Sequence, residues 1–266
     1  MKIQTAFAEV NGTRLYYERA GAGNPLVLLH GFTLDTRMWD DQFEPFAQHA
    51  DVIRYDLRGF GKSALPTELP YNHADDLNAL LNSLEIVQAD VVGLSKGGAV
   101  AADFALDHPD RVRSLILVDT VLGGFQWSNE SNWHNGRVWE VAQTGGIPAA
   151  KAAWLEHPLF RPAHEKPALA ARLRQIVEGF SGWHFVNRNP EHGSKPPAIT
   201  RLDAIRAPVL IILGERDMDD FRAIADTLAQ KIPGARKAVL PGVGHMANME
   251  APEQFNQIVS RFLAEL

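Results

Sequence analysis

Short runs of apolar residues alternate with helix-like segments along most of the chain. The runs are nearly continuous in Leu, Ile and Val, as expected for strands buried on both faces of a sheet. They lie at 26–29, 52–56, 90–94, 113–118, 208–213 and 236–240. Helical patterns lie between them at 36–48, 72–86, 97–108, 219–231 and 251–264. This alternation predicts an α/β protein whose mostly parallel sheet is flanked by helices on both faces.

The beginning of the chain has a different pattern. Two further strand-like runs, 3–10 and 13–19, are separated by Asn11-Gly12, which is a strong signal for a tight hairpin turn. They predict an antiparallel pair at one edge, which brings the expected sheet to eight strands.

The alternation stops between residues 121 and 200. This segment has no strand-like run, and its helix-compatible stretches include 137–143 and 166–179. We interpret residues 121–200 as a helical cap, or lid, inserted into a core made of residues 1–120 and 201–266. Five of the six tryptophans lie in or beside the cap, and most of them are expected to form its own small core. They are Trp127, Trp133, Trp139, Trp154 and Trp183.

The composition of the chain excludes or disfavours several classes of function. The net charge is −6, from 26 basic and 32 acidic residues, so no general positive field favours binding to nucleic acid. Cysteine is absent, which excludes disulfides, thiolate metal sites and a cysteine nucleophile. The first ten residues lack the apolar core of a signal peptide, and the apolar runs are too short to span a membrane. We expect a cytoplasmic protein without a metal or a membrane partner; monomer and dimer both stay open.

Gly93-Leu94-Ser95-Lys96-Gly97 matches the G-x-S-x-G pattern directly after a predicted strand and at the start of a predicted helix. A sharp strand-to-helix turn needs small neighbours, because its serine takes a strained backbone conformation and projects the hydroxyl outward. Ser95 is therefore the candidate nucleophile. The alternative is that Ser95 only caps the helix, which is a common and inert role.

A serine hydroxyl needs a base to remove its proton, and that base needs a carboxylate to orient it. His245 follows the last strand in a glycine-rich loop, and Asp217 follows the preceding strand. The order Ser…Asp…His suits this architecture. Asp119, at the end of an earlier strand, is the alternative acid. Other acidic residues near Asp217 are Glu215, Asp219 and Asp220.

Backbone N–H groups would stabilise the oxyanion that forms during attack on a carbonyl. His30-Gly31-Phe32-Thr33 follows a strand, and Gly31 lets the backbone turn so that the Phe32 N–H is available. The Lys96 N–H at the elbow is the expected second donor. The role of the Lys96 side chain stays open.

With these motifs in place, the chain resembles the α/β-hydrolase superfamily over essentially its whole length. The motifs HGF, YDLRGFGKS, GLSKGG, LGERD and GVGHMANME occur in that family's order and spacing. Gly61-Lys62-Ser63 also imitates the end of a phosphate-binding loop, but Asp56 stands where that loop needs glycine. We therefore expect no nucleotide and no other cofactor.

The resemblance implies a serine hydrolase that cleaves a small carboxylic ester or lactone through an acyl-enzyme. Ser95 separates the chain from dehalogenase-like and epoxide-hydrolase-like relatives, which carry Asp there. Met246 stands where carbon–carbon hydrolases usually carry Trp, which counts against that activity. Carbon–carbon hydrolysis, perhydrolase or haloperoxidase activity, and a ligand sensor with little turnover stay open as alternatives. The expected substrate contacts are His30, Leu94, Trp127 and Met246. A carboxylate-binding or a merely solvated role is open for Arg137, Arg188 and His134.

Overall fold

The structure is a computed structural model that describes residues 2–266. Its centre is one eight-stranded sheet in the order β1-β2-β4-β3-β5-β6-β7-β8, in which β2 pairs antiparallel with β1 and β4 and the other pairs are parallel. The strands are β1 (Gln4–Val10), β2 (Thr13–Gly21), β3 (Pro25–Leu29), β4 (Asp51–Tyr55), β5 (Ala89–Leu94), β6 (Val112–Val118), β7 (Val209–Gly214) and β8 (Arg236–Leu240). The predicted α/β architecture, an eight-stranded and mostly parallel sheet with a hairpin at one edge, is confirmed.

The helices of the core cover the two faces of the sheet. They are α1 (Asp40–Ala47), α2 (His73–Ser83), α3 (Lys96–Asp107), α8 (Asp219–Lys231), α9 (Ala247–Glu250) and α10 (Pro252–Ala264). Helix α1 packs against α10, and α2 packs against α3. The connection β3–α1–β4 runs along the sheet in the opposite direction to β5–α3–β6, so right-handed crossovers place α1 and α3 on opposite faces.

This change of direction occurs between β3 and β5, which are neighbours in the centre of the sheet. Loops after two such strands diverge to opposite faces and leave a crevice at the carboxyl ends of the strands. The segments after β3 and β5 carry Phe32 and Ser95 respectively. The topology therefore brings two predicted site segments together, although they are far apart in the sequence.

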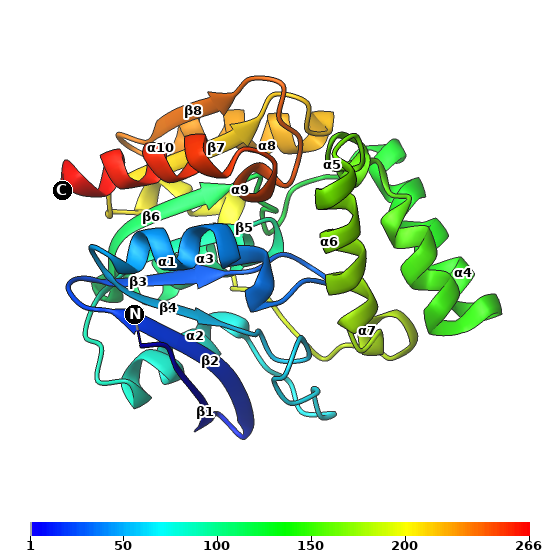
Figure 1. Ribbon diagram of the computed structural model, residues 1–266, viewed down its shortest axis with the longest axis horizontal. Helices are drawn as coiled ribbons and strands as arrows, with labels where there is room; N and C mark the ends of the chain where they lie inside the picture. The colour runs from blue at the N-terminus through cyan, green and yellow to red at the C-terminus, as the bar shows by residue number, and fades with distance from the viewer. Residues whose placement is uncertain (1) are drawn as a thin grey trace.

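Between β6 and β7 the chain forms helices. They are α4 (Asn129–Leu155), α5 (Arg161–His164), α6 (Pro167–Gly179) and α7 (Trp183–Val186), with short 3₁₀ turns beside them. Figure 1 shows these inserted helices, in green, beside the carboxyl ends of the strands. The limits of the cap at residues 121 and 200 stay a prediction.

The tryptophans of the inserted segment do not form a common core, so that expectation is wrong. Only Trp154 is buried, whereas Trp133 and Trp139 are 57% and 41% exposed. Among residues 2–266, no helix is both long and apolar enough to cross a bilayer.

Candidate active site

Ser95 lies at the turn from β5 into α3 with φ 55° and ψ −114°, a conformation that non-glycine residues rarely adopt. A Cβ on Gly93 would lie 2.2 Å from the Gly97 carbonyl oxygen, and one on Gly97 would lie 2.2 Å from the Leu29 carbonyl oxygen. Glycine is therefore required at both positions, because the neighbouring backbone leaves no room for a Cβ atom. Ser95 occupies the N-cap position, but its side chain makes no capping hydrogen bond. The inert capping role is therefore wrong for this residue.

His245 and Asp217 form a buried pair. The imidazole Nδ1 lies 2.8 Å from Asp217 Oδ2, and the Asp217 Oδ1 accepts a 2.8 Å hydrogen bond from the Met218 N–H. A carboxylate at Nδ1 keeps the proton on that nitrogen, so Nε2 is left with its lone pair. His245 lines the same cavity as Ser95, and the Phe221 ring packs 4.4 Å from the imidazole, centroid to centroid.

The other acidic residues beside Asp217 have different partners. Glu215 accepts a hydrogen bond from the Gly242 N–H, Asp219 pairs with Arg222, and Asp220 accepts hydrogen bonds from Ser128. Of these carboxylates, only Asp217 contacts His245.

Asp119, the alternative acid, lies behind this pair. Its Oδ1 accepts a 2.7 Å hydrogen bond from the Gly214 N–H, which ties the end of β6 to the end of β7. Burial, together with the neighbouring Asp217 carboxylate, raises the pKa of Asp119 well above its usual range. The charged form of Asp119 is therefore disfavoured, and its hydrogen bond supports the strand ends.

His30 does not line the cavity, which corrects the expectation that it contacts substrate. It is fully buried; its Nδ1 lies 2.8 Å from the Gly31 carbonyl oxygen, and the Leu57 N–H donates to its Nε2. Burial lowers the pKa of His30 to about 4, so the ring is neutral and its Nδ1–H donates. Because the C=O and N–H of a trans peptide point in opposite directions, holding the Gly31 carbonyl also sets the direction of the Phe32 N–H.

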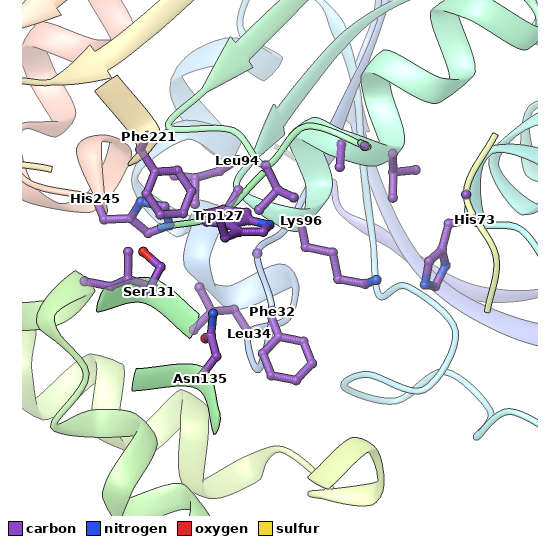
Figure 2. Close-up of a pocket in the computed structure, with 18 of the residues that line it drawn as sticks. Phe32, Leu34, His73, Leu94, Lys96, Trp127, Ser131, Asn135, Phe221 and His245 are labelled. Atoms are coloured by element: carbon purple, nitrogen blue, oxygen red, sulfur yellow. The ribbon is translucent and has the colours of Figure 1, made fainter. Parts of the chain in front are cut away.

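The cavity beside Ser95 has a volume of about 370 Å³ and is lined mainly by apolar side chains from both the core and the inserted segment. The predicted Leu94 and Trp127 line it, as does Phe32 (Figure 2). The predicted Met246 lines it too. Arg137 and Arg188 are exposed outside it, and His134 also does not line it. Lining residues that the sequence did not reveal are His73, Asn135, Trp154, His157, Glu191 and Phe221.

The Lys96 side chain forms an ion pair along the cavity wall. Its Nζ lies 2.6 and 2.8 Å from the two carboxylate oxygens of Glu191, which comes from the segment after α7. The positive charge that Lys96 brings to the strand-to-helix turn is therefore neutralised by Glu191. Lys96 is also the first residue of α3, so its backbone N–H has no intrahelical acceptor.

Comparisons with known proteins confirm the predicted fold. The family model described as "alpha/beta hydrolase fold" matches residues 24–252. A putative 2-succinyl-6-hydroxy-2,4-cyclohexadiene-1-carboxylate synthase of Bacillus subtilis (strain 168) is 29% identical, over 94% of this chain and 93% of its own. The enol-lactonase structure from Burkholderia xenovorans LB400 is 28% identical with a TM-score of 0.81. The match covers 97% of this chain and 100% of the enol-lactonase chain. A thermophilic esterase from Thermogutta terrifontis is 29% identical with a TM-score of 0.80, covering 98% of both chains.

Proposed function

Because the chain belongs to the α/β-hydrolase family, we propose that it is a serine hydrolase of small carboxylic esters or lactones. The observation that carries this proposal is the 2.8 Å contact between His245 and Asp217, beside a cavity that also exposes the strained elbow residue Ser95. A nucleophile and a base at one cavity, with an acid that orients the base, are the parts that acyl transfer needs.

In the proposed reaction, Ser95 Oγ attacks the ester carbonyl carbon while His245 Nε2 accepts the hydroxyl proton. Asp217 stabilises the resulting imidazolium through its hydrogen bond to Nδ1. The Phe32 and Lys96 backbone N–H groups donate to the oxyanion. When the intermediate collapses, the carbon–oxygen bond to the alcohol breaks and His245 returns the proton to the leaving oxygen.

Water completes the cycle on the acyl-enzyme. His245 takes a proton from the water as its oxygen attacks the acyl carbon, and then protonates Ser95 Oγ as the carboxylic acid leaves. The products are one acid and one alcohol, or a hydroxy acid from a lactone. The apolar cavity of about 370 Å³ favours small, largely apolar substrates.

The test is steady-state hydrolysis of short 4-nitrophenyl esters and lactones, together with labelling by a fluorophosphonate. Ser95→Ala is expected to lower kcat on the order of a million-fold and to abolish labelling. Ser83→Ala, at an exposed serine on α2, is the control and should retain both. An unchanged rate in Ser95→Ala would refute the nucleophile. Single-turnover labelling without steady hydrolysis would favour a ligand sensor. Selective cleavage of carbon–carbon bonds would favour a carbon–carbon hydrolase, and peracid formation would favour a perhydrolase.

A further inference from the structure

The Lys96–Glu191 ion pair lies on one particular side of Ser95. In the proposed reaction His245 must protonate the leaving oxygen, so the alcohol part of the substrate lies toward His245. Figure 2 shows that the Lys96 side chain extends away from His245 and toward His73. The ion pair therefore borders the space that is left for the acyl part.

The ion pair is held in place by its surroundings. Glu191 Oε2 accepts a 2.9 Å hydrogen bond from the Asn189 side-chain amide, and Asn189 Oδ1 accepts one from the Tyr71 hydroxyl at 3.0 Å. The neighbouring backbone is also tied down, because Glu191 bridges to Tyr71 and the His192 N–H donates to the Tyr71 carbonyl. Glu191 is thus anchored against Lys96 and is not free to swing aside for a competing anion.

At the end of the cavity beside His73, the positive charge of Lys96 is balanced by the negative charge of Glu191. Burial alone would raise the pKa of Glu191, but the Lys96 ammonium and His73 together outweigh burial and hold the pKa well below its usual range. Apart from histidines, Lys96 is the only basic side chain that lines the cavity within residues 2–266, and Asp103 adds a further carboxyl group. His73 lies 3.6 Å from the Glu191 carboxylate. Histidines aside, no basic side chain of residues 2–266 is left unpaired on the acyl side of the cavity.

We propose that the Lys96–Glu191 ion pair forms the wall of the acyl subsite and makes the enzyme select uncharged acyl groups over acyl groups that end in a carboxylate. The proposal rests on the proposed ester hydrolysis and adds a substrate class to it. A carboxylate next to this wall would meet an ammonium already neutralised by Glu191. It would lose its hydration without gaining a free counter-ion. Glu191 is then the residue that determines specificity.

The test compares two esters of matched shape, mono-4-nitrophenyl adipate and 4-nitrophenyl 6-methylheptanoate. Both have four methylene groups after the reacting carbonyl, the same number as a lysine side chain, and they end in a carboxylate or an isopropyl group of similar shape. The measured quantity is the ratio of kcat/KM for the adipate to kcat/KM for the uncharged ester, corrected for spontaneous hydrolysis. The wild-type ratio is expected to lie well below one.

Glu191→Gln keeps the shape of the side chain and removes its charge, which leaves the Lys96 ammonium without its counter-ion. The ratio should rise by about tenfold or more, because a single charge a few ångströms away is worth that much in a partly shielded site. The double variant Lys96→Met/Glu191→Gln removes the ammonium as well, so its ratio should fall back. Glu165→Gln is the matched control, because it neutralises an exposed carboxylate paired with Arg216 outside the cavity.

Three results would overturn the proposal: a wild-type enzyme that does not discriminate against the adipate, a ratio unchanged by Glu191→Gln, or an equal shift in the control. A purely structural tether would change both esters equally and leave the ratio constant. If both esters are cleaved in a Ser95-dependent reaction and only the ratio fails to move, the ester hydrolysis stands and the specificity role falls. If the wild-type protein cleaves neither ester, both proposals fail.

Discussion

The proposed oxyanion loop, residues 30–33 after β3, is hydrogen-bonded to the inserted helices, and this contact gives a quantitative prediction. Trp154 of α4 donates a 2.7 Å hydrogen bond from Nε1 to Thr33 Oγ1, and the Thr33 hydroxyl donates to the Phe32 carbonyl at 2.6 Å. Thr33 is a β-branched residue at φ 63°, a strained conformation that its surroundings must hold. We expect Trp154 to position the loop that carries the Phe32 N–H.

Trp154→Phe keeps an aromatic ring beside Phe32, whose centroid lies 5.4 Å from that of Trp154, and removes the N–H donor. One neutral hydrogen bond contributes about 0.5–1.5 kcal/mol, which corresponds to about two- to tenfold in rate. An oxyanion donor acts mainly in the transition state, so kcat should fall by that factor while KM changes little. Steady-state kinetics on a short 4-nitrophenyl ester measures both parameters.

An alkyl boronic acid supplies an independent readout, because its tetrahedral adduct with serine resembles the oxyanion. Its inhibition constant should weaken by the same factor as kcat/KM. Thr33→Val should have a similar effect, and the double variant should lose little more, because both changes interrupt one hydrogen-bonded chain. Trp139→Phe, at an exposed tryptophan of the same helix, is the control. A loss confined to KM, or additive losses in the double variant, would refute the positioning role.

Three further predictions concern the strand ends, the acid response and the elbow. Asp217→Asn should lower kcat by about 10⁴-fold. Asp119→Asn, whose amide oxygen can still accept from the Gly214 N–H, should stay within about threefold. The reverse order would make Asp119 the acid. Burial lowers the pKa of His184 to about 3, so below pH 6.5 the unfolded state binds a proton that the native state does not. The His184→Phe protein should therefore gain stability relative to wild type as the pH falls from 6.5 to 4.5. The difference between their free energies of unfolding, measured by urea titration, should grow by about 1.4 kcal/mol per pH unit. A difference that stays constant with pH would contradict this. Gly93→Ala should lower the free energy of unfolding by about 1–3 kcal/mol and abolish most of the activity. Gly136→Ala is the control: no atom lies near its added Cβ, so it should not lower the melting temperature.

Sequence reasoning identified the parts of this protein that depend on local pattern. Most of the six strands from β3 to β8 are nearly continuous apolar runs, and the predicted ends of all six lie within one residue of the observed ends, as for 26–29 against Pro25–Leu29. The elbow was recognisable because close approach of two backbones requires glycine at Gly93 and Gly97, a constraint that a short motif records. Helix α4 was harder to predict. It spans 27 residues and is interrupted at Gly146, where φ is 69° and ψ is −167°, and only 137–143 was predicted. Its Asn, Gly and Pro residues obscure the helical period.

The roles that sequence reasoning missed depend on distant contacts. His30 stands in a recognisable loop, but its two ring nitrogens are used by the Gly31 carbonyl and the Leu57 N–H. Nothing local to His30 indicates that Leu57, 27 positions away, supplies that donor. In the same way, Glu191 pairs with Lys96 across 95 positions, and no motif surrounds it. Such pairings follow from where the sheet and the inserted segment meet.

The site thus divides between two kinds of support. Ser95, Asp217 and His245 all follow strands of one sheet, so their relative positions depend on strand register and buried backbone contacts. Trp154 and Glu191, which contact the oxyanion loop and the acyl side of the cavity, come from the segment between β6 and β7. Substitutions in that segment can therefore change which acyl group fits, or how well the oxyanion is held, without moving the three reacting side chains. For this reason Glu191→Gln is expected to change the choice between two esters, whereas changes at Asp217 affect every ester alike.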